Sequence, residues 1–211
     1  MAPVEAVDTP GIRGFLHQPE NANGEGILLT HGAGSNCRSP LLTALANEFC
    51  AAGFAVLRYD LPFRQLRPTG PPIRTAEKDQ QGIAAAIEWM KGRVSGRVFA
   101  GGHSYGGRMT TMLAASHAEL VAGLLLLSYP LHPPKSPTQL RTAHFPNLKT
   151  PALFIHGTRD GFGTVEEMTA ALKLIPAKTE LLPIEGAGHE LLTKTGELPA
   201  RVLDGFGRFF S

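Results

Sequence analysis

The chain has 211 residues, of which 43 % are apolar and 18 % are charged, and this composition is typical of a globular protein. Its 20 Lys and Arg residues and 18 Asp and Glu residues leave a formal net charge of +2, so the overall charge favours neither nucleic acid nor a membrane as a partner. The 24 Gly and 17 Pro residues follow no repeat, which excludes collagen-like and linker segments and predicts many tight turns.

The start of the chain and its cysteines predict a cytoplasmic protein. Residues 1–8 contain acidic residues and no basic segment followed by an apolar one, so no secretory signal is expected. The longest apolar run, Val121–Leu127, is far shorter than the roughly 18 residues of a membrane span. Cys37 precedes a predicted helix and Cys50 lies near its end, so the helix would hold them too far apart for a disulfide and we expect two reduced thiols.

Short apolar runs alternate with amphipathic patterns along the chain. The first two runs, Val4–Val7 and Ile12–His17, predict an antiparallel hairpin. Further buried strands are expected at Gly26–Thr30, Phe54–Tyr59, Arg97–Gly101, Val121–Ser128, Ala152–His156 and Glu180–Ile184. Helices are expected at 40–52, where Ser39 would be the N-cap, and around 83–90, 109–113, 165–172 and 198–209. This alternation predicts one α/β domain over residues 1–211, a mostly parallel twisted sheet with helices on both faces.

Two proline-rich loops interrupt this rhythm. Residues 60–74 hold four prolines and residues 129–147 hold five, and each loop follows the carboxyl end of a predicted strand. Because ligands of open α/β sheets bind at that edge, we expect both loops to lie near the active site. The second loop is too short for a cap domain, which predicts an open, shallow site.

A candidate nucleophile lies between the predicted strand 97–101 and the helix after it. The residues Gly102-His103-Ser104-Tyr105-Gly106 match G-x-S-x-G, the motif of a strand-to-helix turn that lifts a serine hydroxyl out of the sheet. The glycines remove side chains that would collide with neighbouring backbone. The alternative is an ordinary glycine-rich turn.

A serine needs a base and an orienting acid to become a nucleophile, and with this motif they follow in the order acid, then histidine. His189 is the only histidine after Asp160, and each follows a predicted strand end, so we predict Ser104, Asp160 and His189 as catalytic residues. Glu185 and Asp60 are the rivals for the acid. His31 and His156 each precede a glycine at a strand end and are expected to anchor loops by hydrogen bonds.

The negative charge that develops in acyl transfer needs two N–H donors. One is expected from the backbone of Tyr105, directly after the serine at a helix N-terminus. The other should come from the loop His31-Gly-Ala-Gly-Ser35, where Ala33 is the first choice and Gly34 the second. Together these amides would form an oxyanion hole.

These motifs resemble the α/β-hydrolase superfamily over nearly the whole chain. More narrowly, His31-Gly-Ala-Gly, Gly102-His-Ser-Tyr-Gly-Gly-Arg108 and Tyr129-Pro-Leu-His-Pro-Pro134 resemble a branch of small dienelactone-hydrolase-like proteins. Authentic dienelactone hydrolases carry a cysteine nucleophile, whereas this chain has Ser104, which argues against dienelactone itself as substrate. The resemblance implies a serine hydrolase with no metal and no organic cofactor.

Substrate contacts are predicted from the loops near this site. Phe63, His132 and Phe162 are the main candidates, with packing of the loop 129–147 as the alternative role for His132. Tyr105, Leu131 and Phe145 are further candidates for an apolar lining. The segment 58–74 carries a local positive charge that would attract an anionic substrate, or else is a solvated loop; its charged residues are Arg58, Arg64, Arg67 and Arg74 against Asp60. Arg108, on the first turn after the serine, is expected to have a structural role.

Three functions fit these residues. The first is hydrolysis of a small carboxylic ester or thioester through an acyl-enzyme on Ser104. The second is acyl transfer, in which an alcohol or thiol replaces water on the same intermediate. The third is a non-catalytic interaction module on the same fold, since a fold does not determine a function. The histidines have no H-E-x-x-H or comparable spacing, so no metal site is expected.

Overall fold

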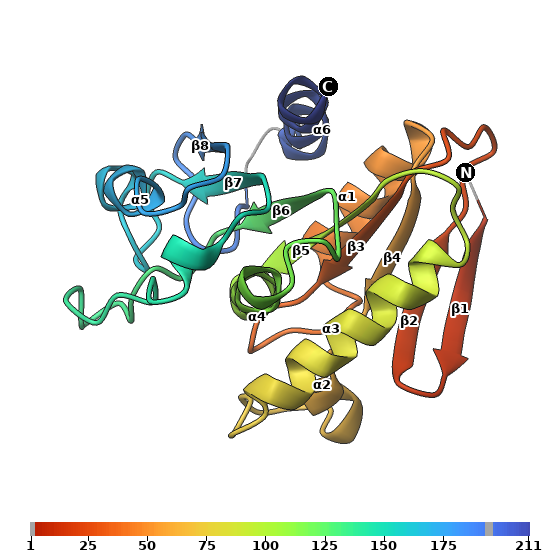
Figure 1. The fold of residues 1–211 in the computed structure, drawn as a ribbon, viewed down its shortest axis with the longest axis horizontal. Helices are drawn as coiled ribbons and strands as arrows, with labels where there is room; N and C mark the ends of the chain where they lie inside the picture. Colours follow the sequence, from red (N-terminus) through yellow and green to blue (C-terminus); the bar gives the residue numbers. More distant parts are fainter. Residues whose placement is uncertain (1–2, 193–195) are drawn as a thin grey trace.

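The computed structural model describes residues 3–192 and 196–211, and these residues form an eight-stranded sheet with helices on both faces (Figure 1). The strands are β1 (Val4–Thr9), β2 (Ile12–His17), β3 (Gly26–Thr30), β4 (Ala55–Tyr59), β5 (Val98–His103), β6 (Gly123–Leu127), β7 (Ala152–Gly157) and β8 (Thr179–Ile184). The helices are α1 (Pro40–Ala51), α2 (Pro62–Leu66), α3 (Ala76–Lys91), α4 (Tyr105–Ser116), α5 (Val165–Leu172), α6 (Leu198–Phe210) and a 3-10 turn η1 (Phe145–Asn147).

The strands follow the order β1-β2-β4-β3-β5-β6-β7-β8. Pairing is antiparallel between β1 and β2 and between β2 and β4, and it is parallel from β4 to β8. The predicted hairpin and the mostly parallel sheet are therefore confirmed. Parallel strands place their carboxyl ends at one edge, so the loops after β3, β5, β7 and β8 lie close together.

Each central strand is buried on both faces, which explains its continuous apolar sequence. Ile27 and Leu29 of β3 pack with α1 and α6, whereas Leu28 of the same strand packs with α3 and α4. Side chains alternate between the two faces with a period of two, so both faces of the strand need apolar residues. On the α6 side, the ring centroid of Phe206 lies 4.9 Å from that of Phe99 and 5.1 Å from that of Phe49, which attaches the last helix to the sheet and to α1.

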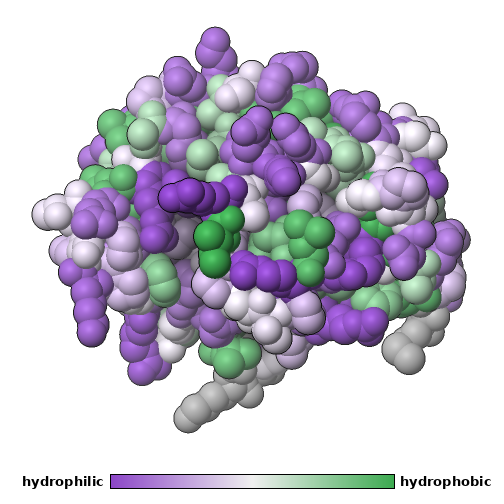
Figure 2. Space-filling view, turned by 90° about the horizontal axis from the view of Figure 1, so that it is seen from below, coloured by the Kyte–Doolittle hydropathy of each residue, from purple (hydrophilic) through white to green (hydrophobic). Residues whose placement is uncertain are grey.

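The start of α1 and the two proline-rich segments lie where the sequence predicts them, with small differences. Pro40 is the first residue of α1, but the side chain of Ser39 makes no capping hydrogen bond there. The segment 60–74 contains the short helix α2, and 129–147 contains only η1, so no large cap domain is inserted within the described residues. The space-filling view from the α2 side shows apolar side chains in small patches between hydrophilic ones (Figure 2). In the described parts of the chain no helix is long and apolar enough to cross a membrane.

Candidate active site

Ser104 lies at the turn between β5 and α4, in a backbone conformation that most residues avoid. Its φ is 51° and its ψ is −113°. Its N–H donates to the carbonyl of Leu127 at 2.8 Å, and the N–H of Gly106 donates to the carbonyl of His31 at 3.2 Å. These bonds to two neighbouring segments hold a strained turn that points the serine side chain away from the sheet.

The glycines on either side of Ser104 are required by close backbone contacts. A Cβ at Gly102 would lie 2.2 Å from the carbonyl oxygen of Thr30, and one at Gly106 would lie 2.7 Å from the carbonyl oxygen of His31. Any side chain at either position would push β3 and the loop after it away from the turn. The reason inferred from the sequence for these glycines is confirmed.

Three side chains from different strand ends form a continuous hydrogen-bonded chain. Nε2 of His189 lies 2.8 Å from Oγ of Ser104. Nδ1 of the same ring lies 2.8 Å from Oδ2 and 3.0 Å from Oδ1 of Asp160. Because a carboxylate only accepts hydrogen bonds, Nδ1 carries the proton and Nε2 is free to accept the serine proton. This geometry can activate a hydroxyl as a nucleophile.

Asp160 is held as a buried carboxylate. Burial raises the pKa of this group, but its hydrogen bond to His189, the charge of that ring and the N–H of Phe162 at 2.8 Å together lower the pKa below its ordinary value. The two rival acids lie elsewhere: Glu185 is exposed and accepts from Thr158, and Asp60 accepts from the N–H of Cys37. The structure thus brings only Asp160, of these three acids, to His189.

Two rings hold His189 in place. Nε2 of His103 lies 2.8 Å from the carbonyl oxygen of His189, so the residue before Ser104 is tied to the loop of the histidine. The ring of Phe162 stacks on the His189 ring with centroids 4.0 Å apart and an angle of 29°. The sequence predicted Phe162 as a substrate contact rather than as a support for His189. It did not indicate the role of His103, because that contact joins residues 86 positions apart.

The loop after β3 is oriented by a buried histidine beneath it. The N–H of Leu61 donates to Nε2 of His31 at 3.1 Å, so the ring proton is on Nδ1 and is donated to the carbonyl of Gly32 at 2.9 Å. Burial lowers the pKa of His31, which keeps this ring neutral. Because C=O and N–H point in opposite directions across a trans peptide, fixing the Gly32 carbonyl turns the Ala33 N–H away from His31.

The same loop is held from its other side by Arg64 of α2. This buried guanidinium donates to the carbonyl of Ala33 at 2.7 Å and to that of Ser35 at 2.8 Å. The bond to Ala33 orients the next peptide, whose N–H belongs to Gly34. Among the described residues, no acceptor takes the backbone N–H of Ala33 or of Tyr105.

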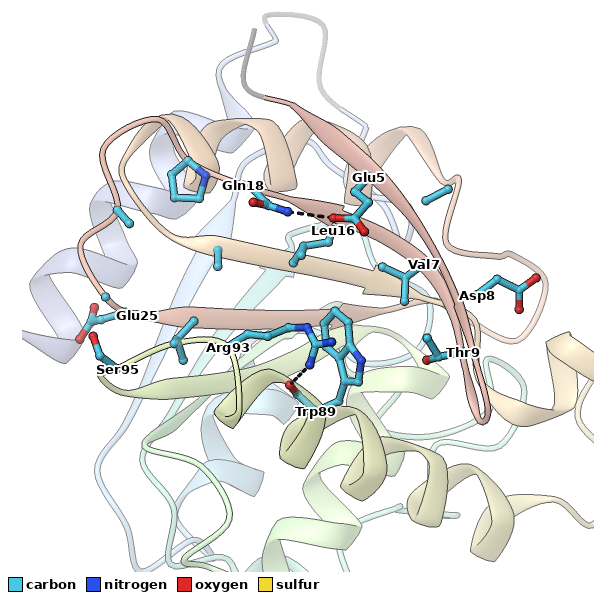
Figure 3. A pocket seen from close by; sticks show the side chains of 16 residues that line it. Glu5, Val7, Asp8, Thr9, Leu16, Gln18, Glu25, Trp89, Arg93 and Ser95 are labelled. Atoms are coloured by element: carbon cyan, nitrogen blue, oxygen red, sulfur yellow. Dashed lines mark hydrogen bonds between the residues drawn. The ribbon is translucent and has the colours of Figure 1, made fainter.

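Ser104 lines a cleft of about 540 Å³, a volume in the range of small-molecule binding sites. The cleft is lined by Gly32, Ala33, Gly34, Ser35, His103, Ser104, Tyr105, Arg108, Pro130, Arg141, Phe162, His189 and Glu190. A larger hollow of about 700 Å³ lies between the β1–β2 hairpin and the end of α3 (Figure 3). There the guanidinium of Arg93 covers the ring of Trp89 at 3.6 Å, and Gln18 donates to Glu5, but no serine–histidine pair is present.

Comparison with known proteins identifies the family of this chain. A family model described as "Alpha/beta hydrolase domain" matches residues 23–198. The chain belongs to the α/β-hydrolase family. The α/β-hydrolase fold expected from the sequence, and the resemblance on which it was based, are therefore confirmed.

Solved structures with low sequence identity share this α/β-hydrolase fold over their whole length. Dienelactone hydrolase from Anabaena variabilis is 23 % identical with a TM-score of 0.77, over 99 % of this chain and 97 % of that one. Est1E from Butyrivibrio proteoclasticus, solved with ferulic acid, is 19 % identical with a TM-score of 0.76, over 97 % and 98 %. A Xanthomonas campestris protein described as an α/β serine hydrolase without lid is 16 % identical with a TM-score of 0.76, over 98 % and 94 %.

Several predicted substrate contacts of this hydrolase do not reach the cleft. Phe63 is buried between the rings of His31 and Tyr105, with both centroid distances at 5.6 Å. His132 is buried and bonds to the carbonyl of Pro133 and to Glu167. Leu131 and Phe145 are likewise in the core. These four side chains do not line the cleft in the described residues, because Phe63, Leu131 and Phe145 pack into the apolar core and His132 bonds to Glu167 of α5.

The predicted basic segment does not line the cleft in the described residues. Arg58 is buried and donates to His17 and to the carbonyl of Cys37, and Arg64 supports the loop after β3. None of the four arginines of residues 58–74 lines the cleft among the described residues. The lining contains Arg108 and Arg141 instead, although the sequence predicts a structural role for Arg108.

One buried acid beside the site was missed. Asp79, the fourth residue of α3, accepts from the hydroxyl of Tyr105 at 2.7 Å, from Thr75 at 2.8 Å and from the N–H of Phe63 at 3.0 Å. It therefore ties α2 and α3 to the first residue of α4. An acid in the first turn of a helix is usually a favourable charge at the helix dipole, so its position in the sequence did not indicate this contact. The loop-anchoring role expected for His156 is confirmed, since its Nε2 lies 2.8 Å from the carbonyl of Gly163.

Proposed function

We propose that this protein is a serine hydrolase that cleaves a small carboxylic ester or thioester. The observation that supports the proposal most directly is the chain of hydrogen bonds from Asp160 through His189 to Ser104, which ends in the cleft. Ser104 is the proposed nucleophile, His189 the base and Asp160 the acid that orients it. The absence of a large inserted cap domain in the described residues favours small or accessible acyl groups.

The reaction would proceed in two acyl-transfer steps. Oγ of Ser104 attacks the carbonyl carbon while its proton moves to Nε2 of His189, and the backbone N–H groups of Ala33 and Tyr105 stabilise the oxyanion. Collapse breaks the bond to the leaving oxygen or sulfur, which takes the proton from His189. Water then attacks the acyl-enzyme, with His189 again accepting a proton, and releases the acid and free Ser104.

The residues nearest to Ser104 need no metal or cofactor for this sequence of steps. In the described residues no group of three or more His, Cys, Asp or Glu side chains is placed to hold a metal ion. Cys37 and Cys50 are both free and buried, which supports the expectation of a reducing, cytoplasmic setting.

A fluorophosphonate probe tests the proposal because it reacts only with an activated serine. Native protein should be labelled and should hydrolyse short-chain 4-nitrophenyl esters or acyl thioesters, whereas Ser104→Ala should do neither while keeping its fold by circular dichroism. Folded native protein that is neither labelled nor active on either series would refute the proposal and leave a binding module. Products formed with added alcohols or thiols would identify acyl transfer instead of hydrolysis.

A further inference from the structure

Two arginines share the cleft with Ser104. Arg108 lies four residues after the serine on α4, and its N–H donates to the carbonyl of Ser104 at 3.0 Å. Arg141 belongs to the segment 129–147, which follows β6, and lines the same cleft. Two positive charges in a partly enclosed site repel each other, so their placement costs free energy unless an anion joins them.

Neither guanidinium is neutralised by the protein itself within the described residues. Nε of Arg108 is buried and has no hydrogen-bond partner. No carboxylate of the described chain lies within 4.0 Å of either guanidinium, although ion pairs form elsewhere, as between Arg13 and Asp60. Burial and the charge of Arg108 both lower the pKa of Arg141, in accord with two like charges that are close and incompletely solvated.

The backbone of Arg141 is held firmly where its side chain enters the cleft. Its N–H donates to the carbonyl of Leu131 at 2.8 Å, and its own carbonyl accepts the hydroxyl of Tyr129 at 2.6 Å. Its Nη1 makes one long bond, 3.3 Å to the carbonyl of Pro130, which leaves the other guanidinium donors available. Arg108 is likewise fixed by the first turn of α4, so the two side chains begin from rigid positions.

The other titratable groups nearby do not supply the missing negative charge. His144 faces Arg108, and burial together with that charge lowers its pKa to about 4, so its ring is neutral at pH 7. Tyr129 has its pKa raised by burial and remains a neutral phenol. Glu190 is the only carboxylate in the described lining, and this exposed side chain lies more than 4.0 Å from both guanidinium groups.

We propose that Arg108 and Arg141 together bind a carboxylate of the substrate, so that the preferred esters or thioesters carry a negative charge close to the scissile bond. A guanidinium presents paired N–H donors that match the two oxygens of a carboxylate. This inference rests on the proposed function, since it names the substrate class of the same site. It also moves the predicted anion-binding role from residues 58–74 to a different pair of arginines.

Matched ester pairs test the inference. On the acyl side, the 4-nitrophenyl monoester of glutaric acid is compared with 4-nitrophenyl pentanoate. On the leaving-group side, the butyrate ester of 4-hydroxybenzoate is compared with that of 4-hydroxyacetophenone. We expect native protein to favour the charged member of at least one pair by about 10- to 100-fold in kcat/KM, the range of a hydrogen-bonded charge.

Three single variants separate the cleft pair from general electrostatics. Arg108→Gln and Arg141→Gln should each reduce the charged-to-neutral ratio of kcat/KM about tenfold or more. The matched control is Arg67→Gln, because Arg67 is exposed in the originally predicted basic segment and does not line the cleft. It removes the same charge and should leave the ratio unchanged. An equal loss in Arg67→Gln, or no loss in either cleft variant, would overturn the inference.

A binding measurement keeps this inference distinct from the proposed function. Glutarate should slow fluorophosphonate labelling of Ser104 in native protein but not in Arg108→Gln, and neutral glutaramide should protect neither. Labelling and neutral-ester hydrolysis without a carboxylate preference or glutarate protection would refute the anion site and leave the hydrolase intact. If the probe never labels the protein, calorimetry can measure the binding of glutarate to Ser104→Ala directly. Binding that is lost in the double variant Ser104→Ala/Arg108→Gln would still support the anion site, and no binding to Ser104→Ala would refute it.

Discussion

Nε2 of His103 donates to the carbonyl oxygen of His189 at 2.8 Å, so the residue before the proposed nucleophile holds the loop that carries the proposed base. Burial lowers the pKa of His103, and the neutral ring therefore has one proton, which must be on Nε2 because a carbonyl only accepts. The turn at residues 103–104 thus carries both the Ser104 hydroxyl and the His103 ring that holds the loop of His189.

The first prediction concerns this support. His103→Leu should lower kcat about tenfold and change KM less than threefold, because His189 would be displaced from the reacting serine rather than from the substrate. His103→Gln retains an N–H donor at similar reach and should recover most of kcat. Steady-state kinetics on a 4-nitrophenyl ester distinguish the two variants, with circular dichroism as a check of folding. Equal kcat values for Leu and Gln would show that the hydrogen bond is not what positions His189.

The second prediction concerns the orienting acid. Asp160→Asn should lower kcat by about 10³-fold or more, because an amide N–H group facing Nδ1 favours the wrong ring tautomer. Glu185→Gln is the matched control, since this rival acid is exposed and makes only a 3.4 Å bond to Thr158. Its kcat should stay within twofold of native. A larger effect at Glu185 than at Asp160 would reassign the acid.

The third prediction concerns the loop that carries the Ala33 amide. Arg64→Met removes the buried donors to the carbonyls of Ala33 and Ser35 and should lower the free energy of unfolding by about 2–4 kcal/mol. It should also reduce kcat more than it changes KM, because an oxyanion donor acts in the transition state. Arg67→Met, an exposed neighbour, should leave both unchanged. Urea unfolding and kinetics measure the two effects, and an unchanged kcat in a destabilised Arg64→Met would limit Arg64 to stability.

The fourth prediction concerns acid stability at a site remote from the cleft. His17 is 1 % exposed, and Nε of Arg58 donates to its Nε2 at 2.8 Å. Burial and the charge of Arg58 lower the pKa of His17 from 6.5 to about 4, so the unfolded chain binds the proton more readily than the folded one. The stabilisation is complete above pH 6.5 and is lost as the pH falls toward 4, by about 2–3 kcal/mol.

Urea unfolding at pH 7 and at pH 4.5 measures this loss. In His17→Gln the side-chain oxygen can still accept from Arg58 but does not titrate, so stability should fall less between the two pH values than in native protein. His144 titrates in the same window in both proteins and cancels from the comparison. An identical pH dependence in the variant would assign the acid sensitivity to other groups.

Much of the fold was predictable because its signals are local. The buried runs at 26–30 and 152–156 coincide with β3 and most of β7, since a strand covered on both faces needs an uninterrupted apolar sequence. Gly102 and Gly106 belong to the motif that predicts the turn around Ser104. Glycine is needed at both positions because a Cβ there would lie within 3 Å of backbone oxygen atoms. The motif predicts an acid and then a histidine after the serine, and Asp160 and His189 fit this order at strand ends, which parallel pairing places at one edge.

The sequence by itself thus determined the α/β architecture, the strand-to-helix turn at Ser104 and the chain order of its two proposed partners. Only the tertiary structure decided that Asp160 rather than Glu185 or Asp60 reaches His189. It also decided that Phe63 and His132 are buried, and that Arg108 and Arg141 rather than residues 58–74 line the cleft. Backbone patterns are encoded by neighbours in sequence, whereas the direction of a loop side chain depends on which distant residues pack against it or accept its hydrogen bonds.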